Sequence, residues 1–382
     1  MSSMMDRSCT RLQAMGQLVK RAYKYRFYPT SVQAEQLAQT FGCVRLVYNK
    51  ALEERTRAYQ IEGRRVSYAE SSAALTRWKR TEELSFLNEV SCTPLQQALR
   101  HLQAAFVNFF AGRARYPVFK SRKKTRASAE YTRTAFRWRR GRLTLAKMNI
   151  PLDIVWSRPL PEGAEPSTVT VSWDAAGRWF VSILVEEEIA PLPCSRAMVG
   201  VDVGLTHLAV LSSGEKIANP RHERADRRKL AKAQRALART TKGSRNRVKA
   251  RLVVARIHAR IADRRRDHLH KVTTRLVREN QVIAVEDLAV RNLVKNRSLA
   301  RVISDASWRQ LRTMLAYKAS WYGRELLVVD RWFPSSKQCS VCGVVGESMS
   351  LGVRDWVCGC GVHHDRDVNA ARNILAAGLA ER

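Results

Sequence analysis

Residues 199–210 have the sequence VGVDVGLTHLAV, in which Asp202 interrupts an apolar, strand-like run. A carboxylate inside such a run is paired, bound to a metal or placed at a strand end, because removing a charge from water is costly. Gly200 and Gly204 flank the acid and leave room for a close approach of backbone or phosphate. The wider segment 197–215 predicts two strands around a turn, with Asp202 as a candidate functional residue.

Two further acids occupy comparable positions. Glu286 ends the apolar run VIAVE at 282–286, and Asp367 precedes VNAARN, where it can cap the last helix. Singly, the three acids are explained as a turn residue, a strand-end surface acid and a helix cap. Together they suit a site for two Mg²⁺ ions, roughly 3.5–4 Å apart, that hydrolyses phosphodiesters. Neighbouring acids compete for this role: Asp287, Asp330 and Asp365.

The charge of the chain indicates a polyanionic partner. The 382 residues include 68 Lys and Arg against 34 Asp and Glu, which gives a net charge of +34. Nucleic acid is the favoured partner, because each phosphate that is bound releases a counterion. A ribosomal-type basic protein and a protein of anionic membrane surfaces are alternatives. No apolar run approaches the roughly 20 residues of a membrane-spanning helix, so we expect a cytoplasmic, nucleoid-associated protein.

The chain is long enough for two or three domains. Residues 1–19 form a short leader, and KRAYKYRFYP at 20–29 predicts a strand with one cationic face. A helical region with Ser31 as its cap extends to about residue 112. Residues 113–190 contain strand-like runs, among them a hairpin around DAAG, and the strand at 20–29 is their expected partner. The alternating strands and helices that follow predict an α/β architecture.

A cysteine cluster predicts a structural zinc site. Cys339-x-x-Cys342 and Cys358-x-Cys360 are separated by 15 residues, and four thiolates in two such pairs suit a tetrahedral Zn²⁺. The N-terminus shows no signal peptide, so the cluster indicates metal rather than disulfides. The second pair is one residue shorter than usual, which makes His363 an alternative fourth ligand.

The order of these motifs resembles that of the TnpB proteins of bacterial insertion sequences, the OrfB family, which is related to type V CRISPR nucleases. The matching stretches cover nearly the whole chain after the leader: YKYRFYPTSVQAEQLAQTFGCVRLVYNKAL, LQQALRHLQAAFVNFFAGRARYPVFKSRKK, GRWFVSILVE, VGVDVGLTHLAVLSSGE, VIAVEDLAVRNL, FPSSKQCSVCG and HDRDVNAARNIL. Such an ordered set is specific to the family.

The resemblance implies a multidomain fold of α/β and α+β parts. A wedge domain, a β-barrel, is split between residues 20–30 and 113–195. A helical recognition domain, residues 31–112, is inserted into it. An RNase-H-like RuvC nuclease domain follows at 196–382 and contains a zinc ribbon at 335–362.

The resemblance also implies an RNA-guided DNA endonuclease. Such a protein binds a guide RNA from the transposon end, one protein per guide, and cuts target double-stranded DNA beside a short motif, using Mg²⁺. The family's catalytic acids correspond to Asp202, Glu286 and Asp367, so the resemblance selects Asp367 over Asp365. Its zinc ligands correspond to the four clustered cysteines, from which the shortened second pair departs.

Three groups of residues are candidates for nucleic-acid contact. Two groups are basic or aromatic and suit backbone contact and stacking: Lys24, Arg26 and Tyr28 in the first strand, and Lys120, Arg122, Lys123 and Lys124 in a basic loop. The third group, Tyr48, Asn49 and Lys50, lies where the family reads its target-adjacent motif. For Tyr48 a second interpretation stays open, a core tyrosine with solvated neighbours.

Alternatives to the guided nuclease remain. A nuclease-inactive, RNA-guided DNA-binding repressor of the same family would lack one or more of the acids, and all three positions are acidic here. A strand-joining transposase would need a signature that the sequence does not contain. An RNA-binding zinc-ribbon protein would make the acids incidental.

Overall fold

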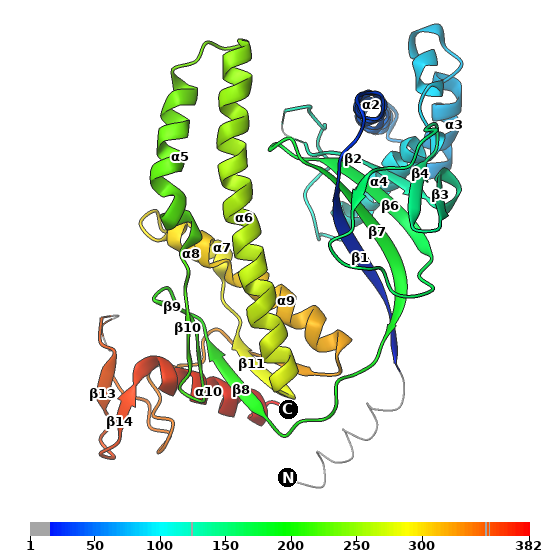
Figure 1. The fold of residues 1–382 in the computed structure, drawn as a ribbon. Coiled ribbons are helices and arrows are strands. Elements are labelled where there is room, and N and C mark those ends of the chain that lie inside the picture. The colour runs from blue at the N-terminus through cyan, green and yellow to red at the C-terminus, as the bar shows by residue number, and fades with distance from the viewer. Residues whose placement is uncertain (1–15, 124, 348–349, 351) are drawn as a thin grey trace. The chain divides into compact units, whose positions relative to one another are not determined.

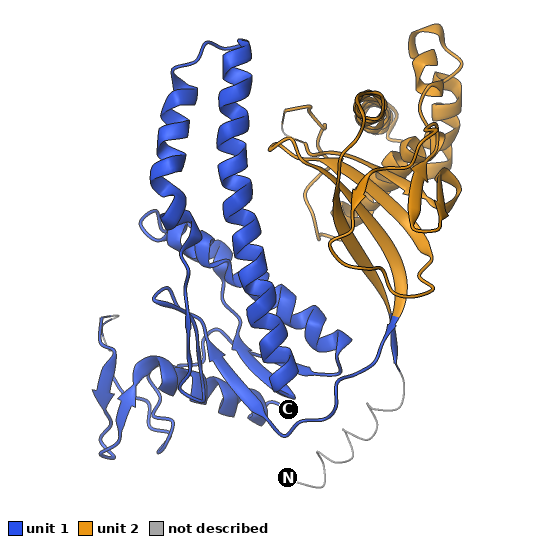
Figure 2. Ribbon diagram, in the orientation of Figure 1, with its two compact units in different colours: residues 1–18, 188–382 blue, residues 19–187 orange. Residues whose placement is uncertain are grey.

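The computed structural model describes residues 16–123, 125–347, 350 and 352–382. They form two compact units (Figure 2): one comprises residues 19–187, and the other comprises 188–382 with the described residues before Val19. The finer division expected from the sequence, into leader, wedge, recognition and nuclease domains, stays a prediction.

The unit of residues 19–187 contains a five-stranded sheet in the order β2-β6-β7-β1-β5. Its strands are β1 (Gln17–Phe27), β2 (Ala127–Thr132), β5 (Ile154–Val155), β6 (Pro166–Trp173) and β7 (Trp179–Ile189). The hairpin predicted around DAAG is confirmed, since β6 and β7 pair antiparallel up to Trp173 and Trp179. The first strand joins this sheet, as expected. In the described strand order, β2 and β5 are the edge strands of the sheet, so the expected closure of this sheet into a β-barrel stays a prediction.

Helices inserted between β1 and β2 complete this unit. They are α2 (Ser31–Glu62), α3 (Tyr68–Trp78) and α4 (Cys92–Phe110), with the 3₁₀ helix η1 (Glu82–Asn88). The 3₁₀ helix η2 (Arg133–Ala135) and the hairpin of β3 (Phe136–Arg139) and β4 (Arg142–Leu145) follow β2. The cap of α2 is Thr30, so the prediction of Ser31 is wrong. Gln33 lies three residues after Thr30, and the two side chains cap each other's backbone N–H in a capping box.

The second unit is built on a five-stranded sheet in the order β10-β9-β8-β11-β12. Its strands are β8 (Met198–Asp202), β9 (His207–Leu211), β10 (Lys216–Ala218), β11 (Val282–Glu286) and β12 (Glu325–Val329). Strands β8, β9 and β10 form an antiparallel meander. Strand β11 then pairs parallel with β8, and β12 pairs parallel with β11. This arrangement is RNase-H-like and confirms the predicted fold class.

Helices cover both faces of this sheet (Figure 1): α10 (Arg366–Ala380) lies on one face, and α6 (Arg245–Glu279) and α9 (Trp308–Trp321) lie on the other. This unit also contains α5 (His222–Ala238), α7 (Val290–Leu293) and α8 (Ala300–Ala306). Successive side chains of a strand point to opposite faces of the sheet, so each face has its own hydrophobic core. Val201 and Val285 pack with α6 and α9, whereas Ala284 packs with Ile374 of α10.

Two further features project from this core. The helices α5 and α6 form a long hairpin (Figure 1), and a small element with β13 (Asp355–Val357) and β14 (His363–Asp365) precedes α10. Among the described residues, no helix has the length and apolar character needed to cross a membrane.

Candidate active site and zinc cluster

Two of the three acids end neighbouring parallel strands. β8 and β11 pair with Val201 opposite Val285, so the next residues, Asp202 and Glu286, lie at the same edge of the sheet. The carboxyl ends of parallel strands are where open α/β sheets bind ligands. The structure therefore brings together two residues that are 84 positions apart in the chain (286 − 202).

The third acid approaches from α10, which lies directly on β8. A Cβ atom at Gly200 would be 1.9 Å from the carbonyl oxygen of Ala371, so only glycine permits this close contact. The glycine beside Asp202 thus admits a helix backbone, one of the two uses expected for it. Asp367 lies in the first turn of this helix.

Asp365, the competing acid, has other partners. Its Oδ1 accepts the backbone N–H groups of Asp367 and Val368, each at 3.0 Å, and its Oδ2 lies 2.6 Å from Nζ of Lys216. Asp365 is therefore the cap of α10, and the expectation that Asp367 caps this helix is wrong. Asp365 thus has a structural role, and the choice of Asp367 over it as a metal ligand stays a prediction.

The electrostatics of the site reflect three acids in proximity. Burial, together with the negative charges of Glu286 and Asp367, raises the pKa of Asp202 well above its ordinary value, and Arg354 opposes this in part. Burial also raises the pKa of Glu286, against a hydrogen bond that the Ser335 hydroxyl donates to its Oε1. Burial is thus the main cause of both shifts, and at Asp202 the charges of the neighbouring acids add to it against Arg354 and Arg366.

This donor set fits Mg²⁺. Hard carboxylate oxygens are its preferred protein ligands, and a divalent cation would relieve the repulsion among the acids. Asp367 is held meanwhile by Arg354, whose Nη1 lies 2.9 Å from its Oδ1. Among the described residues, the acids do not form a group whose ligand atoms all lie within 4.8 Å. Ligands shared between two ions roughly 3.5–4 Å apart need not meet that condition.

The other neighbouring acids are engaged elsewhere. Asp287 forms ion pairs with Arg312 and Arg331. Asp330 accepts the backbone N–H of Trp332. These contacts leave Asp202, Glu286 and Asp367 as the acids that share one electrostatic environment.

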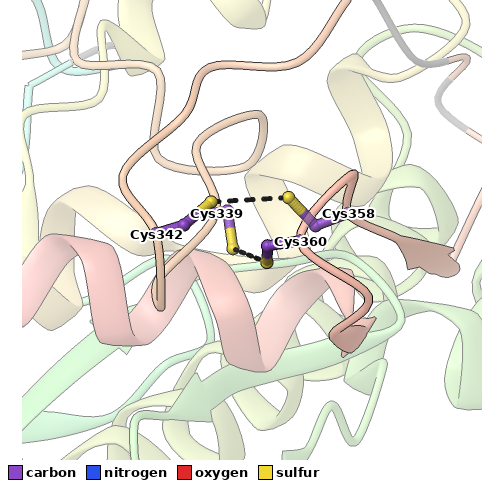
Figure 3. Close-up of side chains that lie close together, drawn as sticks. All are labelled: Cys339, Cys342, Cys358 and Cys360. Carbon is purple, nitrogen blue, oxygen red and sulfur yellow. Dashed lines mark hydrogen bonds between the residues drawn. The ribbon is translucent and has the colours of Figure 1, made fainter.

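The four clustered cysteines meet at one point (Figure 3). Their Sγ atoms all lie within 4.8 Å of one another, with Cys339 3.8 Å from Cys360 and Cys342 3.6 Å from Cys358. A tetrahedral zinc with Zn–S bonds of about 2.3 Å would space its sulfurs about 3.8 Å apart. The shortened second pair therefore still supplies both thiols, and this geometry supports the predicted zinc.

The histidine at this cluster is His364, not His363. Nε2 of the buried His364 lies 3.0 Å from Sγ of Cys339, whereas His363 is exposed. Adjacent residues of β14 face opposite ways, so His363, the alternative fourth ligand, lies on the face opposite His364. Backbone N–H groups, that of Cys342 first, lower the pKa of the Cys339 thiol to about 5, and His364 adds to this. A thiolate is the form that binds metal.

Side chains that the sequence reasoning missed tie the cysteine element to the acids. Two asparagines of α10 reach it: Asn369 Nδ2 lies 2.7 Å from the carbonyl oxygen of Gln338, and Asn373 Nδ2 lies 2.8 Å from that of Ser335. Both asparagines are buried. Polar residues repeating at helical spacing in VNAARN were the signal that could have found them. The acid Asp367 is thus on a helix that the cysteine element braces.

The predicted cationic face of β1 is observed. Tyr23, Tyr25 and Phe27 are buried, while Lys24, Arg26 and Tyr28 alternate with them on the other side. The Lys24 ammonium lies 4.0 Å from the ring centre of Phe180, and Tyr28 is 57% exposed. This surface is accessible to a nucleic acid, and its role stays a prediction.

The second and third groups of candidates are partly structural. Tyr48 is only 6% exposed, and Nζ of Lys120 lies 3.8 Å above its ring. Asn49 exchanges two hydrogen bonds with the backbone of Lys120, and Lys50 lies over the ring of Trp78. The side chain of Tyr48 is therefore buried, in agreement with the second interpretation, a core tyrosine. Arg122 and Lys123 are exposed, and Lys124 lies outside the described residues.

Comparisons with known proteins agree with this picture. Three family models match: one described as "Probable transposase" at residues 181–297, a "Helix-turn-helix domain" at 15–64 and a "Cas12f1-like, TNB domain" at 308–374. A protein of Streptomyces pristinaespiralis, named "Putative RNA-guided DNA endonuclease", is 70% identical over 366 residues, which are 96% of this chain and 91% of that protein. The chain belongs to the TnpB (OrfB) family.

A more distant relative and a solved structure are also similar to this TnpB-family chain. An Escherichia coli K12 protein of the same name, InsQ, is 33% identical over 380 residues, 94% of this chain and 92% of the relative. The solved Cas12f1–sgRNA–target DNA complex shares the fold, with a TM-score of 0.57 at 12% identity over 94% of this chain and 98% of the other. The described residues of this TnpB-family chain that match the helix-turn-helix model lie mainly in β1 and in one helix, α2.

Proposed function

We propose that this chain is an RNA-guided DNA endonuclease that cleaves target double-stranded DNA beside a short motif, by two-metal-ion hydrolysis at Asp202, Glu286 and Asp367. The observation that carries the proposal is the pairing of β8 with β11, which aligns Asp202 with Glu286 next to the helix that bears Asp367. The names of the two bacterial relatives support the guided activity.

The residues of the site divide into metal ligands and residues that position those ligands. Asp202, Glu286 and Asp367 would hold Mg²⁺, which when bound supplies an activated water and stabilises the leaving oxygen of the phosphodiester. The hydroxyl of Ser335 orients Glu286 by donating to it. Arg354 balances the charge of Asp367 from the cysteine element. That element, with zinc at its four thiols, holds α10 in position.

Sequence selection is left to base pairing. In a guided nuclease the protein grips the backbone and checks a short motif, while the guide identifies the target. We infer that the guide RNA derives from the transposon end and that one protein binds one guide. Lys24, Arg26 and Tyr28, on the outward side of β1, are candidates for the grip.

The test begins with the RNA that copurifies with the expressed protein. Its sequence defines the guide, and plasmids that carry a matching target beside a randomised flank are then incubated with the complex and Mg²⁺. We expect linear product from a subset of flanks. Guided binding without any cutting by the unaltered protein would favour the repressor alternative.

A variant assigns the chemistry. Asp202→Asn removes a metal ligand but no phosphate contact, so cutting should fall by more than the roughly 100-fold that loss of an outer-shell partner costs. Guided binding should persist in a gel-shift assay. Asp267→Asn, at an exposed i,i+4 pair with Lys271 on α6, is the control. Unchanged cutting by Asp202→Asn would contradict the assignment.

A further inference from the structure

A cavity opens beside one of the three acids. It has a volume of about 560 Å³ and lies between the ends of β8 and β11, the short helix α7 and the helix α9. Residues that define its wall are Glu286, Val290, Val294, Trp308, Leu311 and Leu315. Apart from Glu286 these residues are apolar or aromatic, and the volume lies within the range of small-molecule pockets.

One wall residue offers an aromatic ring. Trp308 is only 8% exposed and lines the cavity, whereas its Nε1–H is shielded from solvent and has no acceptor within the described part of the chain. Because this donor is not accessible from the cavity, the cavity offers an occupant apolar and aromatic walls.

The charges around the cavity restrict the occupant. Arg291, Arg309 and Arg312 contribute to its lining, and Arg312 is bound to Asp287. Arg291 and Arg309 form no ion pair with any described residue. A metal ion is a poor match for apolar walls and arginines. A flat, apolar group attached to an anion suits both the walls and the charges.

We propose that this cavity receives one unstacked base of the DNA strand that is being cut, next to the scissile phosphate. Its walls, the Trp308 ring among them, would pack on the faces of the base, and Arg291 and Arg309 would contact the adjoining phosphates. The inference rests on the proposed nuclease function and adds a positioning role: the seated base fixes its phosphate beside Glu286.

The first test compares two tryptophans of the same helix. Trp308→Phe keeps an aromatic ring but reduces the face on which a base can stack, whereas Trp321→Phe changes the far end of α9, outside the cavity. With the protein–guide complex, Trp308→Phe should slow single-turnover cutting by about tenfold, the order of magnitude of one base contact. Guided binding should not change. Equal cutting rates for Trp308→Phe and the unaltered protein would overturn the proposal.

The second test moves the base instead of the protein. Targets with a single abasic site at successive positions around the cut should show one position at which cutting by the unaltered protein falls about tenfold. With Trp308→Phe the loss at that position should be smaller, because the two changes remove the same contact. Uniform losses along the strand, or equal losses in both proteins, would contradict the cavity as a base site.

A third measurement separates failure of the inference from failure of the proposed function. If the unaltered complex does not cut, a single-stranded oligonucleotide containing 2-aminopurine still reports base seating. Its fluorescence should change on binding to the unaltered protein–RNA complex and change less with Trp308→Phe. An identical response with both proteins would overturn the base site even where the nuclease function stands.

Discussion

At the scale of single residues, Gly200 sets the distance between β8 and α10. The carbonyl oxygen of Ala371 occupies the place where any side chain at position 200 would begin. The same strand carries Asp202 two residues later, so the contact that buries α10 also determines how near Asp367 comes to its partner acid. Stability and site geometry depend here on one hydrogen atom in place of a methyl group.

Gly200→Ala should therefore destabilise the protein and reduce its activity. Overpacking of this kind costs about 1–3 kcal/mol, since the obstacle is helix backbone rather than a flexible side chain. Gly42→Ala is the matched control: Gly42 lies inside α2, where an added Cβ atom would meet nothing within 4 Å. There alanine should stabilise by about 0.5–1 kcal/mol. Urea unfolding gives the change in the free energy of unfolding for each variant. Changes of the same sign in the two variants would contradict the contact between Gly200 and α10.

Residue-level features differ in how far the sequence predicts them. The acids Asp202 and Glu286 each end an apolar run, so their strand-end positions follow from local pattern. Asp365 and Asp367 do not separate in this way, because they lie two residues apart at the start of α10. Their contacts distinguish them: Asp365 binds Lys216 and backbone N–H groups of the helix, whereas Asp367 binds Arg354. Likewise, nothing local shows that Asn49 binds the backbone 71 residues away.

At the scale of elements, the base of the α5–α6 hairpin contains two half-buried histidines. His222 begins α5 and His268 lies on α6, with ring centres 6.1 Å apart. Nε2 of each ring is buried and lacks a hydrogen-bond partner among the described residues. Charged groups face His222 from the surrounding helices: Asp226, Arg264, Arg265 and Asp305. This junction is where the hairpin joins the sheet-bearing core.

Acid should weaken this junction. Burial lowers the pKa of His222 and of His268 below the ordinary value of about 6.5. Below that pH the unfolded chain binds protons that the folded chain resists, so stability should be constant above about pH 6.5 and fall as the pH drops below it. Thermal unfolding between pH 7.5 and 5.5 measures the effect.

Matched substitutions identify the source of the acid effect. His268→Gln should flatten the pH dependence, whereas His101→Gln, which changes a half-exposed histidine on α4, should leave it unaltered. An equal slope in the His268 variant and the unaltered protein would place the titrating group elsewhere.

The cysteine element should depend on its metal. Cys342→Ser should lower the zinc content of the purified protein, because three thiols hold the ion less well than four. Loss of the metal should also increase amide exchange in α10, whose Asn369 and Asn373 bind this element. Cys92→Ser, at an exposed free thiol that begins α4, is the control. Equal zinc content in the two variants would count against the site.

At the scale of the whole molecule, the charge dominates. The net charge of +34 requires a polyanion, and exposed basic residues lie along the hairpin as well as on β1. The composition alone predicts this positive charge and, from it, nucleic acid as the class of partner. The division into two compact units at 18/19 and 187/188 was not, because the boundaries fall inside continuous strands, β1 and β7.

Affinity for the guide RNA should fall steeply with salt. A protein that makes 6–10 phosphate contacts loses roughly 10³–10⁵ in affinity between 50 and 200 mM salt. Replacing four exposed hairpin residues with glutamine, Arg228, Lys232, Arg235 and Lys249, should reduce the slope of log affinity against log salt by up to about 0.9 per lost contact. Filter binding over a salt series measures this, and a flat response would contradict the electrostatic account.

The position of α10 has a consequence for biosynthesis. On the ribosome, Asp367 is added 81 residues after Glu286 (367 − 286), a delay of about 4–16 s at 5–20 residues per second. Until then the face of the nascent sheet around Gly200 and Ala284 has no helix to cover it. A growing chain thus lacks Asp367 during this delay, and meanwhile it exposes an apolar face of the kind that chaperones bind.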